Sequence, residues 1–212
     1  MGNANNSHVR FFPWIGTHYE EGLENGIKVL ILGDSHYCID APGEQKQKHS
    51  CPKDHHHYCD LCYMDIECHL KTQDTIRELL KGNACRAHQV FESMVKKESM
   101  SQSDFWNRVA FYEFIQYSQT GPGAPLNHGD RSINKDAFLE VLNYLKPDKI
   151  IIWGKSFYRD LGQAFQVHPE FARAFTMTIH NTPVLIMDHP AWRYNKRSDW
   201  TSILKSFIES GE

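Results

Sequence analysis

Two short apolar segments, far apart in the sequence, each end abruptly at polar and titratable residues. The first covers residues 29–32 after Lys28 and is followed by Gly33-Asp34-Ser35-His36, and the second covers residues 184–187 and is followed by Asp188-His189-Pro190. Apolar, β-branched runs of this length are typical of buried parallel strands, which present functional side chains at their carboxyl ends. Both ends carry a histidine and an aspartate, so the pattern predicts that they meet in one functional crevice.

Further strands and helices can be located from the spacing of apolar residues. Strands are expected at 27–32, 149–153 and 183–187, where short apolar runs are bounded by turn residues. Helices are expected over 72–81 and 102–110, over the segment that contains Phe138 and Leu145 and ends at Pro147, after Gly154, and after Ser198. Residues 111–117 fit either a strand or the end of the preceding helix. This alternation predicts an α/β sandwich around a mostly parallel sheet.

The length and composition indicate one globular domain over residues 1–212. Hydrophobic residues make up 41% and charged residues 23%, as in ordinary soluble proteins, and no apolar run approaches the ~20 residues that span a bilayer. The N-terminus lacks the apolar core of a secretory signal, so we expect a cytoplasmic monomer without membrane attachment. The net charge of −3 argues against a general nucleic-acid-binding coat. Residues 146–197 nevertheless hold eight Lys or Arg against four Asp or Glu, which suits a polyanionic partner.

Residues 38–70 interrupt the α/β pattern with an insert rich in Cys and His. The insert contains Cys51, Cys59, Cys62 and Cys68, and its Cys-x2-Cys pair suits one face of a tetrahedral metal ion. Because the insert is too polar to form its own core, we expect these four cysteines to bind a structural zinc, with a His replacing one Cys as an alternative. An iron–sulfur cluster, a redox pair and unligated cysteines are further alternatives, whereas disulfides would not persist in a reducing cytosol.

Three motifs of the chain resemble the uracil-DNA glycosylase superfamily, and they occur in the order that the family has. Gly33-Asp34-Ser35-His36-Tyr37 is similar to a Gly-x-Asp-Pro-Tyr motif, Ile150–Lys155 to a central strand that ends in Leu-Trp-Gly, and His189-Pro190-Ala191 to a His-Pro-Ser motif. The resemblance covers most of the chain apart from the insert. It implies a three-layer α/β/α sandwich around a short, mostly parallel sheet. It also implies a DNA glycosylase that hydrolyses the N-glycosidic bond of a damaged or modified base, leaves an abasic site and needs no cofactor for catalysis.

The resemblance further implies roles for single residues. His189 matches the residue that hydrogen-bonds the leaving base oxygen, and Gly33 and Tyr37 match the base pocket, where Tyr37 packs beside the base. Trp192 or Tyr194 matches the wedge that enters the duplex. The DNA-contacting residues implied in this way are Lys155, Trp192, Arg193, Tyr194, Lys196 and Arg197, and a solvated helix start is the alternative explanation of the basic ones.

The first motif departs from the family pattern at two positions. Ser35 stands where much of the family has an activating Asp, and His36 replaces the Pro of the motif. Asp34, one residue earlier, is the candidate that orients the attacking water, with Ser35 and His36 as alternatives. The candidate catalytic residues are therefore Asp34, Ser35, His36 and His189.

The base-reading position of the family, an Asn, aligns with Glu113. An amide both donates and accepts hydrogen bonds and so matches the edge of uracil, whereas a carboxylate only accepts and suits the exocyclic amine of cytosine. A protonated carboxyl can also donate to N3 of cytosine. Excision of plain cytosine would destroy any genome, so a cytosine-reading enzyme requires a modified base. A surface position for Glu113 is the alternative.

Two other functions are compatible with the first motif. Gly33-Asp34-Ser35 also resembles the Gly-Asp-Ser block of SGNH-type ester hydrolases, in which Ser35 would be the nucleophile. That family has Asp and His three residues apart on one loop, whereas Asp188 and His189 are adjacent and point to opposite sides of an extended segment. The chain also lacks a Gly-x-Asn-Asp block for an oxyanion hole. A catalytically silent DNA-binding relative is the third possibility, because Ser35 replaces the activating Asp.

We expect one tightly bound zinc ion per chain, held by ligands within residues 49–69. Elemental analysis of the untagged protein tests this, and less than about a tenth of an equivalent of any transition metal would contradict it. Cys59→Ser should lower the melting temperature more than it changes the chemistry at the strand ends, because a structural site contributes its binding free energy to folding.

Overall fold

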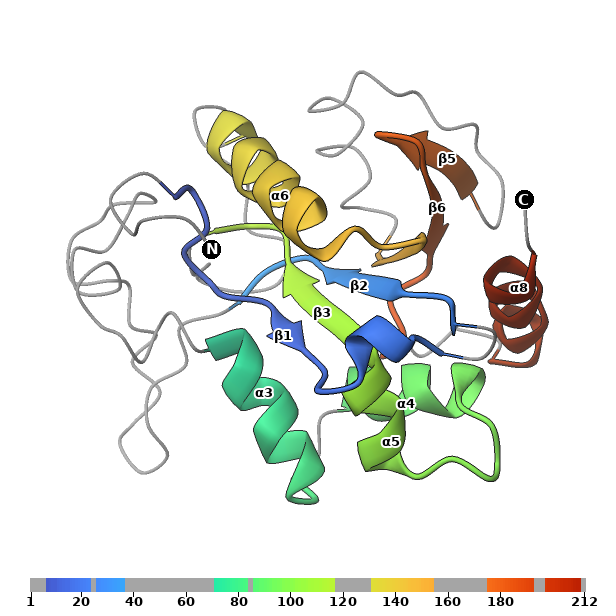
Figure 1. Ribbon diagram of the computed structural model, residues 1–212. Coiled ribbons are helices and arrows are strands. Elements are labelled where there is room, and N and C mark those ends of the chain that lie inside the picture. Colours follow the sequence, from blue (N-terminus) through green and yellow to red (C-terminus); the bar gives the residue numbers. More distant parts are fainter. Residues whose placement is uncertain are drawn as a thin grey trace.

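Six strands form one mixed sheet at the centre of the computed structural model, which describes residues 7–23, 26–36, 71–83, 86–116, 131–154, 175–192 and 197–210 (Figure 1). The strands are β1 Trp14–Ile15, β2 Val29–Gly33, β3 Val109–Glu113, β4 Lys149–Trp153, β5 Phe175–Ile179 and β6 Thr182–Met187. Their order in the sheet is β1-β3-β2-β4-β6-β5. The four inner strands run parallel, and β1 and β5 pair antiparallel at the two edges.

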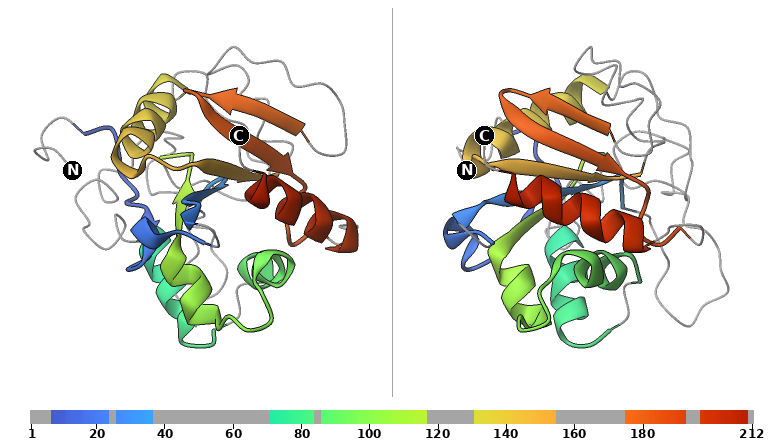
Figure 2. Two further views of the ribbon diagram at one scale, coloured as in Figure 1. Left: turned by 45° about the vertical axis from the view of Figure 1, so that its right-hand side comes forward. Right: turned by 90° about the vertical axis from the view of Figure 1, so that its right-hand side faces the viewer.

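Helices cover both faces of this sheet, so the described chain forms three layers (Figure 1 and Figure 2). The helices are η1 Tyr19–Glu21, α3 Lys71–Leu80, α4 Arg86–Val95, α5 Gln102–Arg108, α6 Arg131–Leu145 and α8 Arg197–Glu209. The buried residues of α6 pack against one face. Those of α3, α4, α5 and α8 pack against the other. No described helix is long and apolar enough to cross a membrane.

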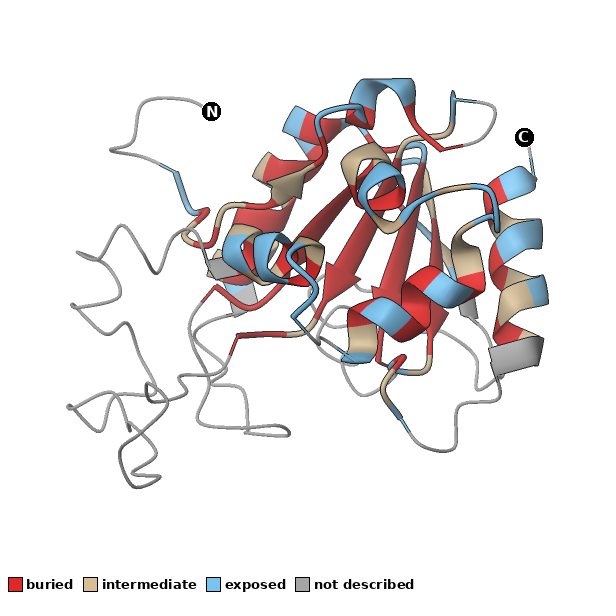
Figure 3. Cartoon of the chain, turned by 90° about the horizontal axis from the view of Figure 1, so that it is seen from below, coloured by how far each residue is buried: buried red, intermediate tan, exposed pale blue. Residues whose placement is uncertain are grey.

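Side chains alternate between the two faces along each parallel strand, because successive residues of a strand point in opposite directions. In β2, Leu30 and Leu32 belong to the core beneath α6, whereas Val29 and Ile31 belong to the core beneath the other four helices. Every residue of β2, β3 and β4 is buried, and Figure 3 shows the strands as a buried layer between more exposed helices. Burial of both faces explains why these strands are continuous apolar runs.

The structure confirms the α/β class and the strands expected from the three apolar runs. The helix expected over 102–110 ends at Arg108, because the chain turns extended at Val109 and enters β3. Residues 109–113 are therefore a strand, which decides between the two alternatives for the start of 111–117. The helix expected after Gly154 lies outside the described residues.

The sequence pattern missed β1, β5 and α4. β5 pairs with β6 through His180 and Asn181, whose φ angles of 48° and 65° lie in the left-handed region that a two-residue hairpin turn requires. β1 spans two residues and pairs only at the sheet edge, so its sequence carries no periodic signal. An edge strand is recognised by its hydrogen bonds to the neighbouring strand, and a single sequence does not show which segments pair.

The first turn of α5, which leads directly into β3, is held by a capping box. Ser101 Oγ accepts a hydrogen bond from the Asp104 N–H at 3.0 Å, and the Ser101 N–H donates to Asp104 Oδ2 at 3.3 Å. We expect Ser101→Ala to lower the free energy of unfolding by about 1 kcal/mol, measured by chemical denaturation, because the helix loses this cap. Ser103→Ala, at an exposed position of the same helix, is the control, and an equal loss in both variants would argue against the cap.

Candidate functional site

The carboxyl ends of the four parallel strands lie together at one end of the sheet. We call this end the carboxyl edge, to distinguish it from the sides of the sheet formed by β1 and β5. Gly33 of β2 lies opposite Glu113 of β3, and Trp153 of β4 lies opposite Met187 of β6. β2 and β4 are themselves paired in parallel, and His189 follows the end of β6 by two residues. The two strand ends singled out in the sequence therefore lie at the same edge, as their pattern predicts.

The carboxyl group of Glu113 lies directly over Gly33. A Cβ atom at position 33 would lie 2.8 Å from Cδ and 2.9 Å from Oε1 of Glu113, and closer still to Oε2, so a larger residue at position 33 would displace this carboxyl. Glu113 is buried, at 9% exposure, so the alternative of a surface position is wrong. Pairing continues beyond the strands, since the Phe114 N–H donates to the Gly33 carbonyl at 3.1 Å and the Ile115 N–H to the Asp34 carbonyl at 3.0 Å.

Burial determines the protonation state of Glu113. Loss of solvation raises the pKa of Glu113 to about 8, and the neighbouring Asp34 carboxylate acts in the same direction. Glu113 Oε2 has no hydrogen-bond partner among the described residues. At neutral pH this side chain is therefore an uncharged acid with one O–H donor and one acceptor oxygen. Asp34 is less buried than Glu113 and belongs to the intermediate class.

Two more buried polar groups at this edge lack a hydrogen-bond partner among the described residues. Ser35 and Trp153 are 8% and 2% exposed, and neither Ser35 Oγ nor Trp153 Nε1 makes a hydrogen bond within the described part of the chain. Leaving such a group unsatisfied costs about 1–3 kcal/mol, so water or a ligand is expected to complete its bonding. Ser35, Trp153 and protonated Glu113 are therefore three groups at this edge that can donate to a polar ligand.

The geometry of His189 selects one tautomer of its ring. The Ala191 N–H donates to His189 Nδ1 at 3.3 Å, and the Trp192 N–H donates to the His189 carbonyl at 2.9 Å. Because Nδ1 accepts, the proton of the neutral ring is on Nε2, which becomes the donor. His189 is exposed at its surface, yet the surrounding protein removes part of its solvation and thereby lowers its pKa, so the neutral form prevails at pH 7. The ring meets Trp153 edge-on, with centroids 6.3 Å apart.

His88 of α4 is a residue of this region that the sequence did not single out. Its ring contacts Trp153 at 5.1 Å and Phe111 at 4.8 Å between centroids, both edge-on. Burial lowers the pKa of His88 to about 3, with a smaller contribution from His189, so the ring is neutral. The available signal was its spacing of three residues from Phe91 on an apolar helix face. His88 and Trp153 together form an aromatic support beside His189.

His36 connects the segment after β2 to two other parts of the structure. Its Nε2 lies 2.7 Å from Thr72 Oγ1 of α3, and its ring meets Phe11 edge-on with centroids 4.9 Å apart. His36 is buried by these contacts. These contacts favour a role for His36 in positioning the neighbouring Asp34 and Ser35 over a direct role in the reaction.

Several predicted site residues lie outside the described part of the chain. They are Tyr37, Lys155, Arg193, Tyr194, Lys196 and the expected zinc ligands Cys51, Cys59, Cys62 and Cys68. Arg197 is the first residue of α8, and Trp192, three residues after His189, is 52% exposed. Within the described ranges, no group of three or more His, Cys, Asp or Glu residues is placed to hold a metal ion. The zinc site stays a prediction.

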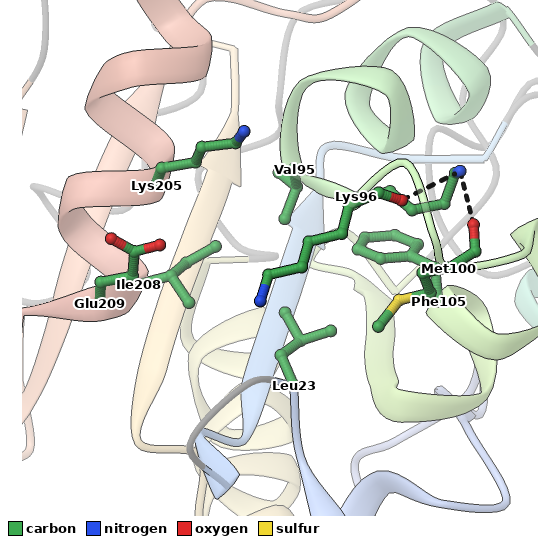
Figure 4. A pocket seen from close by; sticks show the side chains of 9 residues that line it. Leu23, Val95, Lys96, Met100, Phe105, Lys205, Ile208 and Glu209 are labelled. Carbon is green, nitrogen blue, oxygen red and sulfur yellow. Dashed lines mark hydrogen bonds between the residues drawn. The ribbon is translucent and has the colours of Figure 1, made fainter.

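A pocket with an apolar lining lies elsewhere on the molecule (Figure 4). Its lining residues are Leu23, Val95, Lys96, Lys97, Met100, Phe105, Lys205, Ile208 and Glu209. Lys149, the first residue of β4, donates from Nζ to the Ser210 carbonyl at 2.7 Å, just after the end of α8. This contact places the pocket's α8 residues near the amino ends of the strands. The pocket is therefore separate from the edge that carries Glu113 and His189.

Comparisons with protein-family models and with curated proteins give no match for this chain. What this site can do chemically is therefore inferred from its own side chains. These are an uncharged buried acid, a partly buried carboxylate and a neutral imidazole with an Nε2 donor, which the strand order brings to one edge.

The raised pKa of Glu113 predicts a pH-dependent loss of stability. The unfolded chain releases this proton near pH 4.5, whereas the folded chain keeps it until about pH 8. Stability contributed by the neutral acid is therefore complete below pH 4.5 and is lost as the pH rises toward 8, by up to about 1.4 kcal/mol per pH unit. Glu113→Gln should unfold at a higher temperature than the wild type at pH 7.5, and the difference should shrink toward pH 4.5.

Glu92→Gln provides the matched control for this measurement. Glu92 is also buried, but its Oε2 accepts hydrogen bonds from Gln102 Nε2 at 2.8 Å and from Trp106 Nε1 at 3.2 Å. Its replacement should give no gain in stability at pH 7.5. A Glu113→Gln variant whose melting temperature differs from that of the wild type by the same amount at both pH values would contradict the raised pKa.

Proposed function

We propose that this chain is a monofunctional DNA glycosylase that hydrolyses the N-glycosidic bond of a damaged or modified base and leaves an abasic site. The observation that carries the proposal is the placement of the Glu113 carboxyl over Gly33, at the sheet edge where His189 also lies. Enclosed polar groups that can donate and accept are what a pocket needs to hold a base removed from the duplex. The three motifs of the resemblance all fall on the ends of strands that meet there.

The proposed chemistry assigns one task to each of three side chains. The Nε2–H of neutral His189 donates to the oxygen of the leaving base, where negative charge develops as the bond to the sugar breaks. Asp34 orients the attacking water, because it is the carboxylate residue of the first motif and is less buried than Glu113. Glu113 contacts the edge of the base and thereby selects it. None of these steps requires a cofactor.

DNA is the proposed partner. The exposed indole of Trp192 lies three residues beyond His189, which suits a side chain that fills the gap left by an extruded base. The local excess of Lys and Arg over residues 146–197 suits contacts with phosphates. A uracil-like base and a modified cytosine are both compatible with an uncharged Glu113, because a neutral carboxyl donates one hydrogen bond and accepts another.

Ester hydrolysis by Ser35 is the second candidate, since Ser35 Oγ is buried at the same edge and makes no hydrogen bond to the described residues. A serine triad needs a histidine whose Nδ1–H donates to a carboxylate. In this structure His189 Nδ1 instead accepts from the Ala191 N–H, which favours the glycosylase. A silent DNA-binding relative would retain DNA affinity and release no base.

The glycosylase proposal predicts release of a base from DNA without direct strand cleavage. Oligonucleotides that carry uracil, hypoxanthine or modified cytosines are incubated with the protein, and abasic sites are then cleaved with alkali. His189→Ala should lower the rate by about 10²–10³-fold, because one oxyanion donor is lost, while DNA binding persists. His18→Ala, at an exposed histidine paired with Glu21, is the control. Loss of simple ester hydrolysis in Ser35→Ala would favour the second candidate instead.

A further inference from the structure

We infer that Glu113 is the general acid of this site and that its proton goes to N3 of a cytosine-type base as the glycosidic bond breaks. In the same step, Asp34 accepts a proton from the attacking water. The inference rests on the proposed function and deepens it, because it names both the class of base and the means by which the base leaves. It follows from the enclosed carboxyl of Glu113 and from the less buried residue Asp34 at a neighbouring position.

The backbone holds the two carboxyl-bearing residues close together. Glu113 pairs with Gly33 in the parallel register, and Asp34 is the next residue along the chain. The hydrogen bond from the Ile115 N–H to the Asp34 carbonyl, at 3.0 Å, continues the same pairing and restrains the backbone of Asp34. Because Gly33 has no side chain, the Glu113 carboxyl occupies the space above it, on the sheet face that also carries Trp153.

The two carboxyl groups differ in environment, which is the condition for separate acid and base roles. Glu113 is enclosed, and its Oε2 makes no hydrogen bond to the described residues that would stabilise a charged form. Its raised pKa, caused by burial and then by Asp34, keeps the proton in place at neutral pH. Asp34 is less buried, and its charge acts on Glu113 to raise that pKa, so Asp34 suits the charged, proton-accepting role.

Among the described residues, the histidines around this pair do not supply a competing acid. His88 on α4 is kept neutral by burial, with a pKa of about 3. His189 after β6 is neutral because partial loss of solvation lowers its pKa, and its Nδ1 accepts from the Ala191 N–H. His36 lies against Thr72 of α3. On its own strand, Glu113 receives at its backbone carbonyl a hydrogen bond from Gln116 Nε2.

The proton of a neutral acid distinguishes cytosine from uracil. N3 of cytosine carries a lone pair that can accept the proton, whereas N3 of uracil already carries hydrogen and cannot. As the Glu113 O–H bond breaks and an N3–H bond forms, the bond between C1′ and N1 breaks and its electron pair stays on N1. The base then leaves uncharged, while the water oxygen bonds to C1′ and one water proton passes to Asp34. Return of that proton to Glu113 through solvent restores the enzyme, so atoms and charge balance.

The experiment measures single-turnover release from oligonucleotides that carry 5-methylcytosine, 5-hydroxymethylcytosine, 5-fluorocytosine or uracil, between pH 5.5 and 9.5. The wild type should release a cytosine-type base faster than uracil, with a rate that falls above about pH 8 as Glu113 ionises. Glu113→Gln should lower this rate by about 100-fold or more and lose the fall at high pH, because it has no proton to give. Glu92→Gln, the buried and hydrogen-bonded control, should keep the wild-type pH profile.

The leaving-group series separates proton donation from a merely structural role. Fluorine at C5 withdraws electrons and makes the base a better leaving group, so it partly replaces a general acid. Glu113→Gln should therefore gain more from 5-fluoro substitution than the wild type does. Equal sensitivity to fluorine in both proteins, or a wild-type pH profile in a folded Glu113→Gln, would overturn the inference.

The result with uracil separates this inference from the proposed function. If the wild type releases uracil and none of the cytosine-type bases, the assignment of Glu113 as general acid is wrong and the glycosylase proposal stands. If the wild type releases no base from any of these oligonucleotides, whether single-stranded or double-stranded, the general-acid assignment and the glycosylase proposal are both wrong.

Discussion

Burial of both faces of the parallel sheet is the constraint on which the other features depend. Four parallel strands lie between α6 on one side and α3, α4, α5 and α8 on the other, so their side chains must be apolar along almost the whole strand length. Polar and titratable side chains are then found mainly at the positions where the strands end. Glu113, Trp153 and His189 all stand at such positions, which is why one edge of the sheet collects them.

The candidate site is an unfavourable arrangement for stability and a suitable one for chemistry. The Glu113 carboxyl lies enclosed over Gly33, and its Oε2 has no hydrogen-bond partner among the described residues. We expect an amide at this position to make the protein more stable, yet only the acid can deliver a proton. The contrast with Glu92 is informative, since that equally buried carboxyl is satisfied by Gln102 and Trp106. Glu92 therefore supports the fold, whereas Oε2 of Glu113 makes no hydrogen bond to the described residues and is available to a ligand.

Loss of solvation keeps the two histidines beside Trp153 neutral, fully in the buried His88 and partly in the more exposed His189. His88 is enclosed by aromatic rings, and His189 lies against one of those rings, Trp153. Loss of solvation disfavours the imidazolium, so at neutral pH each ring is a hydrogen-bonding group and not a cation. In the proposed reaction, an uncharged donor at His189 can strengthen its bond to the base oxygen as electron density shifts onto the base, without binding the resting substrate more tightly through charge.

The sequence by itself determined the α/β class, three of the four inner strands (β2, β4 and β6) and the polar residues that follow β2 and β6, because period and turn chemistry are local properties. It also indicated Glu113 as a base-reading candidate, but left open whether that residue is buried. Only the tertiary structure decided that the Glu113 carboxyl fills the space above Gly33, eighty positions earlier in the chain, and that His88 and Trp153 support His189. Burial and pKa depend on neighbours brought together by strand order and helix packing, and one sequence read along its length does not contain those distances.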